Sequence, residues 1–372
     1  MKLNQIREDS IIFFITLILL SFGLVMVYSA SSVMALRYHN DSTYYLKKQI
    51  VWAGAGMAAG LAAWRMDYKI FRKLSLPALF LCFILLIITL VGPEVNGARR
   101  WIRLAGFSFQ ASEFTKPVLF TFVAASLAKR ADRLSDFWHG IGPYLFICGT
   151  LVLLIVLEPD FGTAAAICAV IFMMLFAGGA RLSHLGALAL GAIPVLYLQL
   201  FRVGYRKSRI HTFLNPWNDP LGAGFQTIQS FLAFGGGGLT GVGLGQSRQK
   251  LLFLPEPHND FIFSVIGEEF GFVGAAAVVM LFLIFTLFGM RLALKCKDPF
   301  GRLLVFALTL MIGLQALINM GVATGVFPNK GMPLPFISAG GSSVFVALLS
   351  VGIILSVSRG NRRQYDAGAA AN

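Results

Sequence analysis

The sequence predicts an all-α polytopic integral membrane protein with about ten transmembrane helices. Of the 372 residues, 57% are hydrophobic and only 13% are charged, whereas a soluble domain carries roughly 25% charged residues. The mean hydropathy of +0.74 reflects apolar runs along the whole length, so the chain forms many spans rather than one anchor. Residues 1–372 are therefore expected to be a single transmembrane domain.

The apolar runs define the predicted spans. A bilayer core of roughly 30 Å requires about 20 apolar residues per helix, and the run 11–33 meets this length. It is too long for the core of a signal peptide, so we expect it to remain in the mature protein. The other predicted spans are 50–64, 76–92, 114–128, 141–157, 163–179, 185–201, 270–294, 303–322 and 344–357. Several are short and rich in glycine or alanine, which favours close packing between helices.

The basic residues predict the orientation. Ten spans place both termini on one side of the membrane. With the N-terminus inside, the inner segments hold 17 Lys and Arg residues and the short outer loops hold 7. The positive-inside rule therefore predicts that both termini are cytoplasmic, with 358–372 as a cytoplasmic tail. The same rule explains the net charge of +14, so nucleic acid is not expected as a partner.

A long outer loop spans 202–261. Loops of about 60 residues are unusual in compact domains and tend to be functional. Its glycine-rich stretch, 235–245, is not a nucleotide-binding loop, because no Gly-Lys-Ser/Thr follows it and ATP would lie on the other side of the membrane. We expect turns and short helical or re-entrant segments there, since glycine allows close backbone approach.

Ionisable residues near the outer ends of the spans are candidates for function. Glu113 and Lys116 lie three positions apart at the start of a span, so they can pair with each other or with a ligand. Arg100 belongs to the outer segment GARRWIRL, and a planar guanidinium suits phosphate groups. The four cysteines lack the spacing of a disulfide framework or a zinc site, and no metal-ligand cluster is visible.

Six motifs in order carry a family resemblance. They are GARRWIRL, FQASEFTKP, EPDFGT, GFQTIQSFLAFGGGGLTGVGLGQS, LPEPHNDFIFSVIGEEFGFVGA and KGMPLPFISAGGSS. With these motifs the chain resembles the SEDS family of bacterial shape, elongation, division and sporulation proteins. YSASS in the first span and Lys330 in NKGMPLPF make it more similar to the FtsW branch than to the RodA branch.

The resemblance implies a peptidoglycan glycosyltransferase. Such an enzyme polymerises lipid II into glycan strands on the outer face of the bacterial cytoplasmic membrane, during division or elongation. It works with a class B penicillin-binding protein and with other membrane proteins of the divisome or elongasome. A location at the division septum follows from the more FtsW-like motifs.

The resemblance also implies the site residues. Asp260 matches the family's essential aspartate, while Lys116 and Lys330 match its important lysines. Two positions depart from the family pattern: Ala111 replaces a usual proline, and Ala339 replaces a usual tyrosine. Neither departure removes a charged group, so we expect altered packing and intact chemistry.

The chemistry of glycan polymerisation assigns roles to these residues. Asp260 is the expected base for the attacking sugar hydroxyl. The expected diphosphate contacts are the cations Lys116, Lys330, Arg209 and Arg100, with Glu113 beside Lys116. One carboxylate is sufficient because a diphosphate leaves without its own acid, and no covalent nucleophile is evident. We therefore expect inversion at the anomeric carbon. No cofactor is required, although the diphosphate can bring Mg²⁺ with it.

Three alternatives remain open at this level. Asp260 directly precedes an apolar run, so it can serve as a helix N-cap instead of a base. A lipid II flippase is a second alternative, but it needs polar groups along a path through the bilayer, and the ionisable residues here cluster at the outer end. A non-catalytic divisome scaffold is the third alternative, but it would give Lys116 and Asp260 no function.

Overall fold

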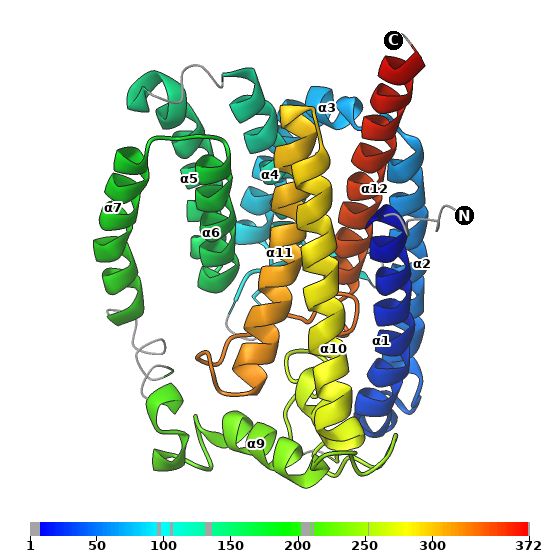
Figure 1. The fold of residues 1–372 in the computed structure, drawn as a ribbon. Coiled ribbons are helices and arrows are strands. Elements are labelled where there is room, and N and C mark those ends of the chain that lie inside the picture. Colours follow the sequence, from blue (N-terminus) through cyan, green and yellow to red (C-terminus); the bar gives the residue numbers. More distant parts are fainter. Residues whose placement is uncertain are drawn as a thin grey trace.

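The computed structural model describes residues 8–94, 98–104, 107–130, 136–201, 209, 212–251 and 253–370. Figure 1 shows a bundle of long helices that run roughly side by side, with α9 lying across one end. The elements are α1 (Glu8–His39), α2 (Tyr44–Arg65), α3 (Lys69–Val91), β1 (Trp101–Leu104), β2 (Phe107–Gln110), α4 (Ala111–Lys129), the π-helix η2 (Phe137–Ile141), α5 (Gly142–Leu157), α6 (Phe161–Ala177), α7 (Leu182–Phe201), the 3₁₀-helix η3 (Pro216–Asn218), α9 (Phe225–Gly237), α10 (Ile262–Lys295), α11 (Pro299–Ala323) and α12 (Gly341–Ala370).

The helices confirm the predicted membrane fold. Each of the ten predicted spans falls on one helix of the described chain, from α1 to α7 and from α10 to α12. Within the described residues, six helices are long and apolar enough to cross a bilayer, judged by their length and composition alone: α1, α3, α7, α10, α11 and α12. The shorter apolar helices α5 and α6 accompany them. Helix α12 continues through the predicted tail as far as Ala370.

Helices α11 and α12 form the centre of the bundle. In the most apolar 18-residue stretch of each helix, 67% of α11 and 83% of α12 is buried inside the bundle, compared with 6% of α7. Figure 1 accordingly shows α7 at the edge of the bundle, beside α6. Helix α12 packs along α2, where Gly56, Gly60 and Gly352 bring the two backbones close together. This packing agrees with the small residues that the sequence places in these spans.

Helix α10 consists of two pieces. Gly271 has φ of +65° inside the helix, a conformation that glycine adopts at little cost. The piece before Gly271 is the short helical segment that follows Asp260, and the piece after it coincides with the predicted span 270–294. Backbone N–H groups of Val242 and Gly243 donate to the carbonyls of Glu268 and Glu269, so the long loop is fastened to the break.

One feature of the connecting segments was not predicted. The arginine-rich segment before α4 forms an antiparallel hairpin in which Trp101 pairs with Gln110 and Leu104 pairs with Phe107. The alternating residues of both strands suit a hairpin that is covered on one face. In the long loop, α9 supplies the helical segment that was expected, and its buried residues, such as Ile228 and Ala233, face the bundle.

Candidate active site

Asp260 lies at the end of the long loop, just before α10. Its backbone carbonyl accepts a hydrogen bond from Asn319 Nδ2 of α11 at 2.9 Å, which fixes the position of the residue against the bundle. No described residue donates a hydrogen bond to its carboxylate. The N-cap of α10 is Phe261, and no side chain caps this helix. The capping alternative for Asp260 is therefore wrong, and the carboxylate is available for another purpose.

The surroundings of Asp260 raise its pKa. Burial is the largest cause, and the negative charge of Glu256 adds to it. The positive charges of Arg209, Arg100 and Lys330 act in the opposite direction, and the resulting pKa is about 6. These three cations come from segments far apart in the sequence, so the fold brings three other predicted site residues within electrostatic reach of Asp260.

Lys330 approaches the carboxylate from the loop between α11 and α12. The next residue, Gly331, lies so close to Asp260 that a Cβ there would be 2.6 Å from Oδ2. The Lys330 side chain extends over Gly162, at the start of α6, and its Nζ lies 2.6 Å from Met332 Sδ. Burial lowers the pKa of Lys330 to about 8, with the nearby cations Lys116 and Arg100 contributing and Asp160 and Glu113 opposing.

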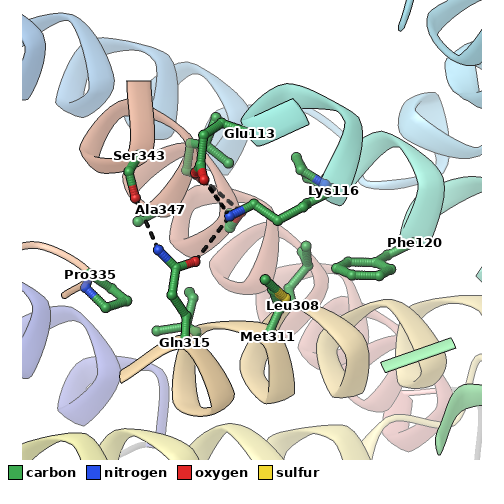
Figure 2. Close-up of a pocket in the computed structure, with 13 residues that line it drawn as sticks. Glu113, Lys116, Phe120, Leu308, Met311, Gln315, Pro335, Ser343 and Ala347 are labelled. Atoms are coloured by element: carbon green, nitrogen blue, oxygen red, sulfur yellow. Dashed lines mark hydrogen bonds and ion pairs between the residues drawn. The ribbon is translucent and has the colours of Figure 1, made fainter. Parts of the chain in front are cut away.

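Lys116 and Glu113 form an ion pair within the bundle. Lys116 Nζ donates to Glu113 Oε1 at 2.8 Å and to Gln315 Oε1 of α11 at 3.0 Å, as Figure 2 shows. Gln315 Nε2 in turn donates to the Pro333 carbonyl at 2.9 Å and to Ser343 Oγ at 3.2 Å. These bonds connect α4 and α11 to the loop that carries Lys330. The adjoining cavity of about 20 Å³ has room for a single water molecule.

Arg100 joins the hairpin to the turn between α5 and α6. Its Nε donates to the Glu158 carbonyl at 3.0 Å, and Nη2 donates to the Pro159 carbonyl. Gln110 Nε2 reaches Asp160 Oδ2 at 3.3 Å, while Asp160 Oδ1 caps α6 by accepting from Thr163 N at 3.3 Å. The hairpin thereby holds Arg100 and Asp160 at the outer edge of the site.

Arg209 approaches the site from the long loop. It is exposed, and its Nη1 donates to the Asn329 carbonyl at 3.3 Å, directly before Lys330. Beside it, a cleft of about 550 Å³ opens between α9, the segment before it and the start of the α11–α12 loop. Arg209 lines this cleft together with Gln226 and Asn329. The cleft is large enough to admit a small ligand next to Arg209.

Two further ionisable side chains, His258 and Glu158, are buried in the connecting segments. His258 is buried against Tyr45 of α2, with ring centroids 4.3 Å apart, and burial lowers its pKa to about 4. Glu158 is fully buried, and neither carboxylate oxygen has a hydrogen-bond partner among the described residues. Burial and the charge of Asp160 raise its pKa to about 8, despite Arg100. Both side chains are therefore largely neutral at pH 7.

Sequence reasoning missed the residues that support the site. Gln315 and Asn319 lie four positions apart on one face of an apolar span, a signal that could have identified them. Behind the loop, Lys250 Nζ pairs with Glu269 Oε1 at 2.8 Å, and Ser29 Oγ donates to the same carboxylate. Nothing local in the sequence indicated this pair. Among the described residues, no group of three or more His, Cys, Asp or Glu residues could hold a metal ion.

Comparisons with known proteins give the family. The family model FTSW_RODA_SPOVE, described as "Cell cycle protein", matches residues 9–363. The probable peptidoglycan glycosyltransferase FtsW of Geobacter metallireducens is 45% identical over 355 residues, covering 95% of each chain. The stage V sporulation protein E of Bacillus subtilis is 41% identical over 365 residues, covering 97% of this chain and 100% of that protein.

Solved structures share the fold over most of the chain. A chain of a peptidoglycan synthase complex that coordinates polymerization and crosslinking superposes with a TM-score of 0.77 at 29% identity. The rod shape determining protein RodA of Thermus thermophilus superposes with a TM-score of 0.69 at 27% identity. These matches cover 94% of this chain, and 97% and 96% of the two solved chains. The chain therefore belongs to the FtsW/RodA/SpoVE family of cell cycle proteins.

Proposed function

We propose that the protein is a peptidoglycan glycosyltransferase that polymerises lipid II on the outer face of the bacterial cytoplasmic membrane, with both termini in the cytoplasm. The observation that carries the proposal is the setting of Asp260. A partly buried carboxylate without a hydrogen bond from any described residue faces the charges of three cations. The names of the relatives and the peptidoglycan synthase complex support the same activity. Their FtsW names favour a location at the division septum.

Asp260 is the proposed general base. As the acceptor hydroxyl oxygen attacks the anomeric carbon, its proton passes to the Asp260 carboxylate, a step that contributes a factor of roughly 100 to 10,000. A pKa of about 6 suits this task, because the carboxylate is mostly ionised at pH 7 yet more basic than an exposed aspartate. Attack on the face opposite the leaving group inverts the configuration at this carbon.

The cations bind the leaving group. The bond between the anomeric carbon and the diphosphate oxygen breaks, and undecaprenyl diphosphate leaves with the bonding electrons. Lys330, Arg209 and Arg100 balance the charge that develops on it. Arg100 and Arg209 offer planar guanidinium groups, which suit phosphate oxygens. Mg²⁺ can accompany the diphosphate and would supply part of the positive charge that its departure needs.

Lys116 and Glu113 act deeper in the same site. Lys116 has three N–H donors, and Glu113 and Gln315 accept two of them. The third is left for a water molecule in the adjoining cavity, which can bridge to a diphosphate oxygen. Through Gln315, the pair also supports the backbone of the Lys330 loop at Pro333. Loss of Lys116 is therefore expected to weaken substrate binding as well as turnover.

The isosteric substitution Asp260→Asn tests the assignment. Purified protein, with and without a class B penicillin-binding protein as the proposed partner, is incubated with labelled lipid II, and glycan ladders are resolved on gels. We expect the variant to lose two to four orders of magnitude in rate, roughly the contribution of a general base. Lipid II binding and thermal stability should stay near wild type, because asparagine keeps the shape of aspartate.

Two outcomes would contradict the proposal. Near wild-type polymerisation by Asp260→Asn shows that the carboxylate is not the base. Absence of polymer from the wild-type protein with its partner, under conditions where both bind lipid II, reopens the flippase and scaffold alternatives. The matched control is Asp219→Asn in the same long loop, whose carboxylate accepts from the Gly222 and Ala223 N–H groups. This control is expected to retain polymerisation.

A further inference from the structure

A second polar hollow lies at the end of the bundle opposite Asp260. Asn319, near the end of α11, contacts the Asp260 backbone, whereas Phe300, at the beginning of α11, lines this hollow. Its volume is about 900 Å³, and it opens between the start of α3, the end of α4 and the start of α11. Figure 1 shows these three helix ends together at the end of the bundle that carries the C-terminus. The polymerase site therefore does not include it.

The charges lining the hollow are predominantly positive. They come from three separate segments of the chain: Lys69, Arg72 and Lys73 of α3, Lys129 of α4 and Lys297 before α11. In the described part of the chain, no carboxylate lies within salt-bridge distance of Lys69, Arg72, Lys73 or Lys129. The acidic lining residue, Asp298, caps α11 by accepting from Gly301 N at 3.2 Å. The hollow thus concentrates positive charge, and four of its cations have no carboxylate partner in the described part of the chain.

The positive-inside rule explains part of this pattern. It accounts for basic residues on the cytoplasmic side, but any position in the inner loops would satisfy it. Here the cations converge on one concave surface. Three of them also lie close together in the first two turns of α3, where Asp67, just before the helix, accepts from the Lys69 backbone N–H at 2.9 Å. An anion in the hollow relieves the repulsion among these cations.

Apolar side chains accompany the cations. Leu76 on α3 lines the hollow and is 62% exposed, while Phe122 and Phe300 contribute a buried apolar floor. Beyond the hollow, α3 carries further exposed apolar residues, among them Phe80 and Leu81, which point away from the core. A ligand that matches this surface has an anionic head and an apolar remainder that can follow α3 into the bilayer.

We propose that the hollow binds the phosphate headgroup of an anionic glycerophospholipid from the inner leaflet. Basic pockets between transmembrane helices on the cytoplasmic side suit such headgroups. Lysine and arginine bind phosphate oxygens through charge-assisted hydrogen bonds. The inference rests on the proposed orientation of the bundle and is independent of the chemistry at Asp260.

Native mass spectrometry of the full-length protein in mild detergent tests the proposal. The probes are phosphatidylglycerol, phosphatidylcholine, polyprenyl phosphate and inorganic phosphate. The test variant combines Arg72→Gln, Lys73→Gln and Lys129→Gln. A matched control combines Arg181→Gln, Arg291→Gln and Arg363→Gln, three exposed arginines that do not line the hollow. Each basic residue near an anionic lipid surface contributes a factor of about five to binding, so the test variant should bind phosphatidylglycerol at least tenfold more weakly.

The expected result separates this ligand from its competitors. Wild type and the control variant should retain phosphatidylglycerol in preference to phosphatidylcholine, and the test variant should not. Equal retention of phosphatidylglycerol by both variants overturns the proposal, as does equal retention of phosphatidylcholine by wild type. If inorganic phosphate displaces phosphatidylglycerol, the hollow is a simple anion site. If polyprenyl phosphate binds more strongly than phosphatidylglycerol, the ligand is a different lipid. Either result also overturns it.

A second variant guards against loss of the fold. Lys73→Arg combined with Lys129→Arg keeps the charge, so it should retain phosphatidylglycerol at the wild-type level. If the glutamine variant is unstable, Lys129→Gln alone, on an exposed side chain at the end of α4, is measured in its place. It should weaken binding by about fivefold. The readout is lipid retention, so a failure here is distinguishable from a failure of the polymerase proposal.

Discussion

At the scale of single residues, the candidate site combines the buried Asp260 carboxylate with several cations, and the nearby charges shift the pKa values of Asp260 and Lys330. Burial and Glu256 raise the pKa of Asp260, whereas the nearby cations lower it. Burial and the nearby cations Lys116 and Arg100 lower the pKa of Lys330. The two groups therefore titrate on either side of neutrality, so near pH 7 the proposed base Asp260 is ionised while Lys330, the proposed diphosphate contact, is still charged.

The first prediction is a bell-shaped dependence of kcat/KM for lipid II on pH. Activity requires ionised Asp260, so it falls as the pH drops through about 6. It also requires charged Lys330, so it falls as the pH rises through about 8. Because kcat/KM reports the free enzyme, both limbs should be visible in initial rates of glycan formation. The Lys330→Gln variant should keep the lower limb, lose the upper one and be less active throughout. A profile that is flat between pH 5 and 7 contradicts the role of Asp260.

A second prediction concerns the glycine beneath Lys330. A Cβ on Gly162 would overlap the Lys330 side chain, so Gly162→Ala should displace the amine from the site. Alanine favours a helix more than glycine does, and the fold should remain intact. Losing a hydrogen bond from a charged group costs about 1.5–3 kcal/mol, so kcat/KM should fall by about tenfold or more. Gly186→Ala, where a Cβ meets nothing within 4 Å, is the control. Equal activity of both variants would show that Lys330 takes no part in the mechanism.

At the scale of elements, small residues allow the central helices to pack. Gly60 of α2 lies so close to α12 that a Cβ would be 2.7 Å from the Leu348 carbonyl oxygen. Across the same contact, Gly352 faces the Gly60 backbone. Because α12 begins two residues after Ala339, in the loop that carries Lys330, this helix pair supports one wall of the site from behind.

The third prediction follows from this contact. Gly60→Leu should force α2 and α12 apart and destabilise the protein by about 1–3 kcal/mol, the usual cost of overpacking. A fluorescence-detected thermal unfolding assay in detergent should show a lower Tm. Gly54→Leu, on the same helix but with no atom within 4 Å of the added Cβ, should leave the Tm unchanged. If the two variants unfold at the same temperature, the close approach is not important for stability.

The elements also show what the sequence could and could not predict. The spans were predictable because each carries its own apolar run, which needs no knowledge of its neighbours. The hairpin was not, because its two four-residue strands are stabilised by contacts with the α5–α6 turn and with Ser342 of α12. The break in α10 depends on a backbone contact between Gly271 and the Leu239–Gly241 segment. Such contacts join distant segments and leave no local pattern.

The site was predictable to a similar degree. Asp260, Lys330 and Lys116 were identified by motif resemblance, and Arg100 by an arginine cluster on the side where basic residues are disfavoured. Their arrangement was not predictable. Lys116 is bonded within the bundle, whereas Lys330 extends over Gly162. The departures from the family pattern fit easily: Ala111 is buried at the start of α4, and Ala339 N donates to the His258 carbonyl through its backbone.

At the scale of the whole molecule, the described ionisable residues lie towards the two ends of the bundle. Asp260, Lys330 and the ion pair of Lys116 lie at one end, and the basic hollow lies at the other. Between them, α11 presents no acidic or basic residue from Leu303 to Ala323. A lipid flippase requires a polar path for the headgroup across the bilayer. This distribution favours chemistry on one face over transport through the bundle.

The last prediction tests that distinction directly. The protein is reconstituted into liposomes whose fluorescent lipid II is confined to the outer leaflet, and a protease site inserted at Gly222, in the exposed turn before α9, reports orientation. Molecules with the long loop outside should make glycan strands when the partner is present, and prior proteolysis from outside should abolish this activity. Lipid II should remain accessible to an external quencher, because no polar path carries its headgroup inward. Protein-dependent protection of the fluorophore from the quencher, without polymer, would instead establish transport and contradict the assignment of the outer face as a catalytic surface.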